Sequence, residues 1–343
     1  MVAIESLTSE GQAILEARID LMPGPTPLEL LPRFSEAIGA EIWVKRDDVG
    51  SLGLVGNKVR KLEYLLADAV RQGASVLVTV GAAQSNHARA TASAAAKLGL
   101  RCVLILSETS TAPPSGNHLL DLLFGAEVEF VDGASWDLLD ATLAERCNEL
   151  ERGGERPYAI PMGGSTPLGA LGLARGYLEL GAQLAAQDVS AEAVIHASSS
   201  GGTQAGLELG RALVGRGPAI RGIAVAKSPG ILEDDVAAIA TGAAALVGLP
   251  RSWSAEEVIL DYAQVGPGYG LPTPAGEAAI RLLAHTEGIL TDPVYSGKGL
   301  AGLIDQVHRG LLHGPVVFWH TGGTPALFDP IHGAALLEAP GSG

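Results

Sequence analysis

The sequence predicts an α/β fold of two domains, each with a mostly parallel open sheet flanked by helices, and three observations lead to this prediction. The chain has 343 residues, which is enough for two domains of about 150 residues each. From Ser75 onward, short apolar runs alternate with helical patterns, and glycine-rich or polar turns separate them. Several of the runs are continuous and rich in β-branched residues, as is typical of parallel strands covered on both faces.

Eight segments are predicted to be strands: 41–45, 75–80, 101–106, 127–131, 158–161, 193–197, 221–226 and 315–320. Helical patterns lie between them, most clearly over 59–72, 87–98, 135–151 and 167–184. Right-handed crossovers would join the strands, and ligands of such sheets bind where loops leave the carboxyl ends. We expect residues 1–55 plus 165–343 to form a large domain and residues 56–164 a small domain inserted in it, with the ligand in the cleft between them.

The composition argues against several classes of partner. A formal net charge of −15 repels phosphate backbones and anionic lipid, so we expect neither a nucleic acid nor a membrane partner. Two cysteines, Cys102 and Cys147, without H-E-x-x-H or C-x-x-C spacing, indicate no disulfide framework and no metal site. The acidic N-terminus has no apolar signal region, which predicts a cytoplasmic protein.

A lysine stands at the start of the first predicted helix of the small domain, in the segment LVGNKVRKLEY (54–64). A helix N-terminus carries partial positive charge, which disfavours a cation and lowers the pKa of an amine placed there. Lys58 is therefore a candidate for a Schiff-base lysine, with an ordinary solvated lysine as the alternative. The spacing does not match a nucleotide-binding loop. Arg60 and Lys61 are predicted to be surface charges, although Lys61, about one turn on, would also fit the same pocket.

A loop rich in small residues, ASSSGGTQAG (197–206), follows an apolar strand and opens a helix. Small residues let backbone N–H groups converge on an anion, and the helix dipole adds to the attraction. No lysine follows, so a single phosphate monoester fits better than a triphosphate. The alternative is an ordinary glycine-rich turn.

Further polar loops stand at other predicted strand ends. GAAQSN (81–86) either caps a helix through Ser85 or Asn86, or holds a substrate carboxylate on its side chains and N–H groups. Tyr269 in VGPGYG and Tyr295 in DPVYSGK lie beside glycines, where there is little for a core aromatic to pack against. Thr321 ends an apolar strand, which would point its hydroxyl into the strand-end crevice.

Taken together, these loops resemble the pyridoxal-phosphate enzymes of the 1-aminocyclopropane-1-carboxylate deaminase and D-cysteine desulfhydrase family, which has the tryptophan-synthase-β-like fold. The resemblance runs from about Pro23 to Phe328, in order and at family-like spacing. The segments that carry it are KRDD (45–48), GNKVRKLEYL (56–65), GAAQSNHARATASAAAKLG (81–99), SGGTQAG (200–206), VGPGYG (265–270), DPVYSGKGLAGLI (292–304) and HTGGTPALF (320–328).

The resemblance implies pyridoxal phosphate as the cofactor and assigns residues to it. Lys58 matches the lysine that bonds to the cofactor, and Lys61 matches a lysine close to its phosphate. Asn86 matches the asparagine that contacts the ring hydroxyl, and Thr321 stands at the ring nitrogen. The phosphate-binding loop matches Ser200, Gly201, Gly202 and Thr203.

The resemblance also implies the residues around a small amino-acid substrate. Lys58, Ser85, Tyr269 and Tyr295 match catalytic positions, with the two tyrosines flanking substrate and ring. The expected substrate-binding residues are Gln84, Ser85, Asn86 and Ser296. A homodimer is expected from the same resemblance.

Two positions divide the family. Its ring-opening deaminases place a glutamate after the DPVY tyrosine and a leucine in H-L-G-G, where this chain has Ser296 and Thr321. A carboxylate beside the ring nitrogen keeps it protonated and deepens the electron sink, whereas a hydroxyl donates to a neutral nitrogen. A shallower sink suits a substrate whose β substituent leaves as the carbanion forms.

The sequence therefore predicts α,β-elimination, with D-cysteine giving pyruvate, ammonia and hydrogen sulfide. The alternatives within this chemistry are L-cysteate or another β-substituted alanine, such as β-chloroalanine or a diaminopropionate, and then 1-aminocyclopropane-1-carboxylate. Two alternatives come from other classes: a cofactor-free Schiff-base enzyme of the aldolase kind and a non-catalytic binder of the cofactor or an amino acid.

Overall fold

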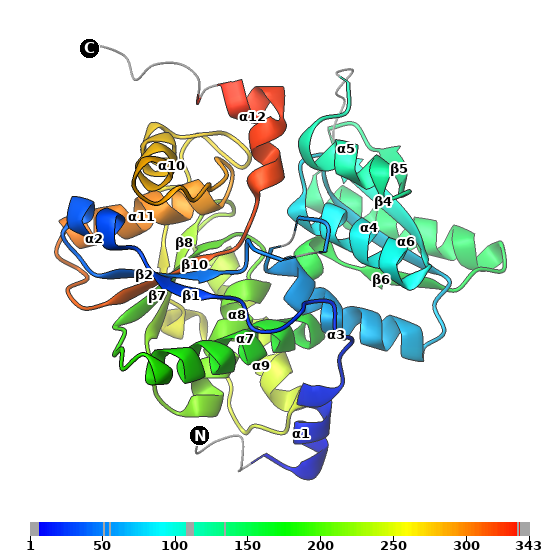
Figure 1. Cartoon of the computed structure of the whole chain (residues 1–343). Coiled ribbons are helices and arrows are strands. Elements are labelled where there is room, and N and C mark those ends of the chain that lie inside the picture. The colour runs from blue at the N-terminus through cyan, green and yellow to red at the C-terminus, as the bar shows by residue number, and fades with distance from the viewer. Residues whose placement is uncertain are drawn as a thin grey trace.

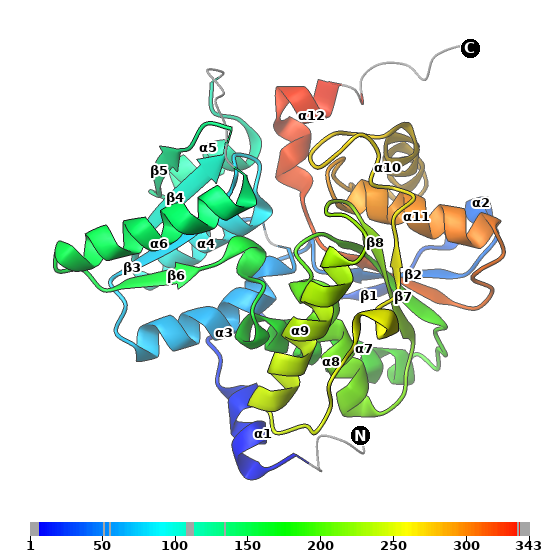
Figure 2. The same cartoon turned by 180° about the vertical axis from the view of Figure 1, so that it is seen from behind.

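The computed structural model describes residues 7–50, 52–54, 56–107, 113–133, 135–334 and 336. The chain forms two lobes side by side, and each lobe is a sheet with helices on both faces (Figures 1 and 2). The smaller lobe is the mostly cyan and green part on the right of Figure 1. The predicted fold class, α/β with two mostly parallel sheets, is confirmed.

The larger lobe is built on a six-stranded sheet with the order β1-β2-β10-β7-β8-β9. All neighbours are parallel except β1 and β2. The strands are β1 (Leu28–Leu30), β2 (Ile42–Arg46), β7 (Ala193–Ser198), β8 (Ala219–Ala224), β9 (Leu260–Asp261) and β10 (Val316–His320).

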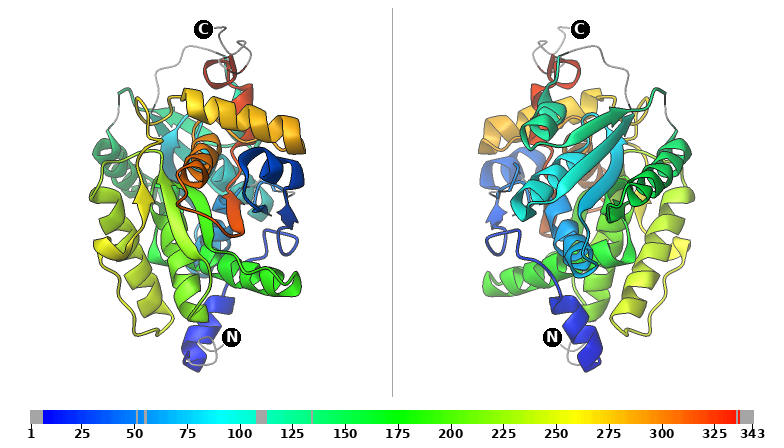
Figure 3. Two further views of the ribbon diagram at one scale, coloured as in Figure 1. Left: turned by 90° about the vertical axis from the view of Figure 1, so that its left-hand side faces the viewer. Right: turned by 90° about the vertical axis from the view of Figure 1, so that its right-hand side faces the viewer.

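Helices cover both faces of this sheet. On one face lie α2 (Pro32–Ile38), α10 (Pro274–Glu287) and α11 (Ser296–His308); on the other lie α7 (Pro167–Ala186), α8 (Gly202–Val214) and α9 (Ile231–Leu246). The left panel of Figure 3 shows the strands between α10 and α11 above and α7 below. Successive side chains of β10 point to opposite faces of the sheet, as expected of a strand. Phe318 packs in the α10–α11 cluster and Trp319 in the α7 cluster.

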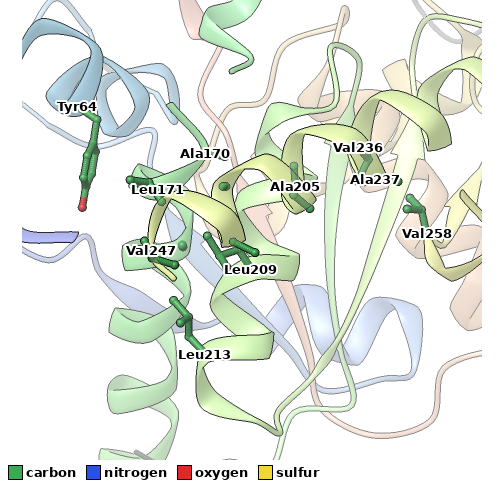
Figure 4. Close-up of a cluster of buried hydrophobic side chains, with 14 of the residues drawn as sticks. Tyr64, Ala170, Leu171, Ala205, Leu209, Leu213, Val236, Ala237, Val247 and Val258 are labelled. Atoms are coloured by element: carbon green, nitrogen blue, oxygen red, sulfur yellow. The ribbon is translucent and has the colours of Figure 1, made fainter. Parts of the chain in front are cut away.

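The core beneath the larger sheet is a helix layer, part of which Figure 4 shows as sticks. Ala170 and Leu171 of α7 meet Ala205 and Leu209 of α8 and Val236 of α9. Small side chains allow these helices to approach closely. Helix α1 (Ser9–Glu16) packs on the same layer, and α12 (Pro330–Ala334), the last described helix, lies near the gap between the lobes.

The smaller lobe is built on a four-stranded, all-parallel sheet with the order β5-β4-β3-β6. Its strands are β3 (Val76–Ala82), β4 (Arg101–Ser107), β5 (Glu127–Phe130) and β6 (Pro157–Ile160). One face packs on α6 (Trp136–Arg152), and the other on α3 (Lys58–Arg71) and α4 (Asn86–Leu98), with α5 (Gly116–Leu123) beside β5. Short 3-10 turns complete the described elements: η1 (Met162–Gly164), η2 (Ala255–Glu257) and η3 (Thr324–Phe328).

All eight predicted strands are present, with ends within two residues of those expected. The strands of the smaller sheet all lie between residues 76 and 160, while helix α3 packs on α7 of the larger lobe as well as on α4. The division into 1–55 plus 165–343 and 56–164 stays a proposal, and residue 55 itself lies outside the described residues. In the described part of the chain, no helix combines the length and apolar character needed to cross a membrane.

Helices α3 and α7 touch along their backbones. A Cβ atom on Gly172 of α7 would lie 1.9 Å from the carbonyl oxygen of Arg60 in α3, so only glycine permits this approach. Because α3 begins at Lys58, this contact fixes the position of that lysine relative to the larger lobe.

Candidate active site

A cavity lies between the lobes at the carboxyl ends of β3, β6, β7 and β10. This is the position that parallel sheets favour for ligands. It is lined by Asn57, Lys58, Gly81, Ala82, Ser85, Asn86, His87, Trp136, Met162, Gly163, Ala197, Ser198, Ser199, Ser200, Gly201, Thr203, Tyr269, Tyr295 and Thr321. Of the predicted site residues, Lys61, Gln84, Gly202 and Ser296 are not among these lining residues.

Lys58 is the first residue of α3 and is half-buried against the cavity. Desolvation lowers the pKa of its amine to about 8. Burial also lowers the pKa of His87 well below its usual value, and the charges of the two nearby lysines act in the same direction. Thr79 Oγ1 donates to Ile160 O at 2.7 Å and therefore accepts from His87 Nε2 at 3.0 Å, which places a proton on Nε2.

The loop before Lys58 is tied to two other parts of the site. Gly56 forms an isolated antiparallel bridge with Gly322, and the Asn57 backbone N–H donates to Thr321 O at 3.2 Å. The Asn57 side chain donates from Nδ2 to Thr203 Oγ1 at 2.8 Å, which joins the lysine loop to the start of α8. Sequence reasoning assigned Asn57 no role, because its partner lies 146 positions away.

A buried network of charged side chains also holds the first turn of α3. Arg60 is 5% exposed. Its Nε donates to Asp47 Oδ2 at 2.9 Å and its Nη1 donates to Glu179 Oε2 at 3.1 Å. Asp47 also accepts from Trp319 Nε1 at 2.7 Å. The prediction of a surface charge at Arg60 is therefore wrong, because its carboxylate partners come from other elements.

The loop after β7 has the form of an anion cradle. Gly201 has φ +82°, and α8 starts at Gly202 without a side-chain cap. The N–H groups of the first turn of a helix have no acceptors within the helix, so these donors stand at the cavity wall. A Cβ atom on Gly202 would lie 2.8 Å from Lys61 Nζ, so glycine lets the lysine approach the loop.

Lys61 lies beneath this cradle and is fully buried, so the prediction of a surface charge is wrong here as well. Its Nζ donates to Gly163 O and to Ser165 Oγ, both at 3.0 Å. Ser165 Oγ in turn shares a hydrogen bond of 2.8 Å with Ser200 Oγ in the cradle. Burial, with the nearby charge of Lys58, lowers the Lys61 pKa well below its usual value. An anion bound in the cradle would favour the protonated lysine.

The loop after β3 both caps a helix and lines the cavity. Ser85 is the N-cap of α4, and its Oγ accepts from Ala88 N at 3.2 Å, which leaves the hydroxyl proton for a ligand. Asn86 Oδ1 accepts from Asn117 Nδ2 at 3.0 Å, which leaves the Asn86 NH₂ group as a donor. The Gln84 side chain points elsewhere: its Oε1 accepts from Asn117 N at 2.8 Å, and the residue lines an adjoining cavity.

Three aromatic rings from both lobes close one side of the cavity. The hydroxyl groups of Tyr269 and Tyr295 are hydrogen-bonded to each other, with ring centroids 6.0 Å apart. Trp136, at the start of α6 in the smaller lobe, packs edge-on to Tyr269 at 5.4 Å. Desolvation raises the pKa of both tyrosines. Trp136 was not assigned a role from the sequence, since its neighbour Tyr269 belongs to the other lobe.

The two positions that divide the family differ in their surroundings. Thr321 lines the cavity at the end of β10. Ser296 is 1% exposed; its hydroxyl bonds to the Asp292 carboxylate and to Gly322 O, the latter at 3.1 Å. Asp292 Oδ2 also accepts from Tyr295 N at 2.8 Å. Ser296 therefore shapes the loop behind Tyr295 in this structure rather than facing the cavity.

The donor set fits a phosphate-bearing aldehyde. An amine with a pKa of about 8 faces the same cavity as an uncapped helix N-terminus, and amide and hydroxyl donors of Asn86 and Thr321 lie on its walls. These are the groups needed to bond an aldehyde, hold a phosphate and contact a pyridine ring. Within the described residues, no group of three or more histidine, cysteine, aspartate or glutamate side chains is arranged to hold a metal ion.

Comparison with known proteins agrees with this fit. Residues 19–322 match the family model described as pyridoxal-phosphate dependent enzyme. A D-cysteine desulfhydrase from Salmonella choleraesuis (strain SC-B67) is 45% identical over 318 residues, which cover 91% of this chain and 95% of that protein. A D-cysteine desulfhydrase from Salmonella newport (strain SL254) is 44% identical with the same coverage.

Solved structures give the same result. The crystal structure of an ACC deaminase homologue superimposes with a TM-score of 0.86 at 38% identity, covering 96% of this chain and 99% of that one. Threonine deaminase isoform 2 from Solanum lycopersicum shares the fold, with a TM-score of 0.69 at 16% identity, over 96% of this chain and 92% of that one. The family, fold and cofactor predicted from the sequence are thereby confirmed. The chain belongs to the pyridoxal-phosphate-dependent enzymes and, among them, to the 1-aminocyclopropane-1-carboxylate deaminase and D-cysteine desulfhydrase family.

Proposed function

We propose that this enzyme catalyses α,β-elimination on D-cysteine, releasing hydrogen sulfide, pyruvate and ammonia. The observation that carries the proposal is that one cavity is lined by both a proton acceptor and proton donors. Lys58 has an amine with a lowered pKa, and Tyr269 and Tyr295 have phenols with raised pKa values. The 45% identity to a D-cysteine desulfhydrase over 91% of the chain supports the same reaction.

The chain's own residues would hold the cofactor at both ends. Lys58 Nζ would bond to the aldehyde carbon, and the N–H groups of Ser200, Gly201, Gly202 and Thr203 would bind the phosphate, with Lys61 close by. Asn86 Nδ2 would donate to the ring hydroxyl, and Thr321 Oγ1 would donate to the ring nitrogen. Pyridoxal phosphate, when bound, withdraws electrons from the Cα atom of the attached amino acid and makes its proton acidic.

Binding of the substrate falls to the loop after β3. Ser85 keeps its hydroxyl proton free, because its oxygen lone pair caps α4, and this proton is available to the substrate carboxylate. Asn86 and the first-turn N–H groups of α4 stand beside it at a positive helix end. Gln84 supports this loop through Asn117, so we assign it an indirect role in substrate binding.

Proton transfer then follows from the two kinds of pKa shift. The neutral Lys58 Nζ accepts the proton from Cα, and the electron pair of that bond forms the Cα–Cβ double bond as the Cβ–S bond breaks. Sulfur leaves with the bonding pair and takes a proton from the Tyr269–Tyr295 pair, which is protonated at neutral pH. The released 2-aminoacrylate reacts with water to give pyruvate and ammonia.

The cavity walls favour a thiol over a sulfonate as the β substituent of the substrate. Among the lining residues in the described chain, Lys58 is the sole lysine and no arginine occurs. A sulfonate would remain charged before and after elimination and would need a fixed cation to replace its hydration. Hydrosulfide, in contrast, is protonated by a tyrosine and departs as neutral hydrogen sulfide.

The test is a panel of D- and L-cysteine, L-cysteate, β-chloroalanine, 2,3-diaminopropionate and 1-aminocyclopropane-1-carboxylate, with the keto acid and the leaving group assayed together. The expected result is pyruvate and sulfide in equal amounts, fastest from D-cysteine. Sulfite release from cysteate would identify the first alternative. Formation of 2-oxobutyrate from the cyclopropane substrate would contradict the interpretation of Ser296 and Thr321. A homodimer and a cytoplasmic location remain predictions.

A further inference from the structure

A buried lysine outside the cavity holds one of the active-site loops. Lys298 in the first turn of α11 is 0% exposed. Its Nζ donates to Val265 O at 2.8 Å and to Gly268 O at 3.3 Å. Both carbonyls belong to the segment 265–270, which carries Tyr269.

The loop that Lys298 holds has little internal structure. Gly266 and Gly270 have φ values of +68° and +78°, conformations that favour glycine. Among the described residues, the one backbone hydrogen bond within 266–271 runs from Leu271 N to Gly268 O, at 3.4 Å. Glycine-rich backbone loses much conformational entropy when it is ordered, so such a loop depends on contacts from outside.

Lys298 and Tyr295 share one rigid element. Tyr295 is the N-cap residue of α11, and Lys298 lies three positions later in the first turn of the same helix. The helix therefore touches the loop twice: through the hydrogen bond between the tyrosine hydroxyls and through the Lys298 ammonium on two carbonyls. The second contact sets where Tyr269 stands relative to Tyr295.

This placement is unfavourable for a lysine unless its contacts compensate. Desolvation lowers the pKa of Lys298, while the charge of Asp292 acts in the opposite direction. The positive end of α11 disfavours a cation as well. A methionine would fill the same space without these costs, so the ammonium is explained by the two carbonyls it binds.

We propose that Lys298 is a positioning residue that holds the 265–270 loop so that the Tyr269 hydroxyl meets Tyr295 at the reacting atoms. The inference rests on the proposed role of the tyrosine pair as proton donor. Lys298 itself is not among the residues that line the cavity. Its removal acts through Tyr269 and leaves the attachment of the cofactor to Lys58 intact.

The test compares Lys298→Met with Lys97→Met, a matched change at an exposed lysine on α4. Hydrogen–deuterium exchange of the amides in 266–271 is expected to speed up by about tenfold or more in Lys298→Met and to stay unchanged in Lys97→Met. This readout needs no turnover, so it separates failure of the inference from failure of the proposed function. Exchange equal to wild type in this segment would overturn the inference.

Kinetics give the second arm. With D-cysteine, kcat of Lys298→Met is expected to fall about 100-fold, the lower end of what a positioned acid contributes, with KM changed far less. Combined with Tyr269→Phe, the loss should not grow, because both changes disable the same donor. Additive losses would overturn the inference. If Lys298→Met does not fold, Lys298→Gln, which keeps an N–H donor without the charge, provides both measurements.

Discussion

The amine of Lys58 provides a direct test of how burial prepares this site. Its pKa is about 8, compared with an ordinary value of 10.5. At pH 7, about one amine in eleven is then neutral, against about one in three thousand for an exposed lysine. The neutral amine is the form that attacks the aldehyde. The apoprotein should therefore react with pyridoxal phosphate about 300-fold faster at pH 7 than it would if Lys58 had the ordinary pKa of 10.5.

The assay follows cofactor attachment to the apoprotein from about pH 6 to about pH 10 by the absorbance that grows near about 410–430 nm. A free lysine derivative measured in parallel corrects for ionisation of the cofactor. Because the pKa is lowered, the rate should rise with pH and level off above about pH 8. Lys58→Ala should never develop the band. A midpoint near 10, or a band that survives in Lys58→Ala, would refute the reasoning.

Three further predictions follow from individual contacts. Asn57→Ala removes the hydrogen bond to Thr203, and a loss of about 1 kcal/mol should weaken cofactor binding about fivefold in a fluorescence titration; unchanged affinity would contradict it. Ser296→Glu places a second carboxylate against Asp292 in a buried site, so the free energy of unfolding should fall by roughly 2–4 kcal/mol in denaturant titrations, and an unchanged midpoint would count against this account. Burial raises the pKa of Asp121 to about 8, so the folded state is penalised increasingly between about pH 4 and pH 8; Asp121→Asn should be more stable than wild type at pH 8 and equal to it near pH 4 in thermal melts, and the reverse order would contradict the shift.

The sheets could be predicted from the sequence because their strands are covered on both faces. A strand such as β3, with Val76, Leu77 and Val78 all buried, is an uninterrupted apolar run whichever face each residue takes. Strands β1 and β9 were missed because they have three and two residues, too few for a pattern. Both are edge strands, and each pairs with a single neighbour.

The sequence predicted those site residues whose local neighbours mark their role. It did not predict residues whose role depends on a contact between distant segments. Lys58 and the cradle beginning at Ser200 are marked by adjacent glycines and small residues. Trp136 reaches the cavity from the opposite lobe, and Arg60 is buried against Asp47 and against Glu179, which lies 119 positions away. No local pattern in the sequence carries that information.

One physical cause accounts for both proton-transfer roles in the proposed reaction. Desolvation is the leading influence on Lys58, Tyr269 and Tyr295 alike. It disfavours the charged form of each group, so the amine gives up its proton and the phenols keep theirs. Among the lining residues that the structure describes there is no carboxylate to oppose the shift at the lysine. A cavity with this lining therefore holds a base and an acid together, which is what removal of a Cα proton and departure of a β substituent require.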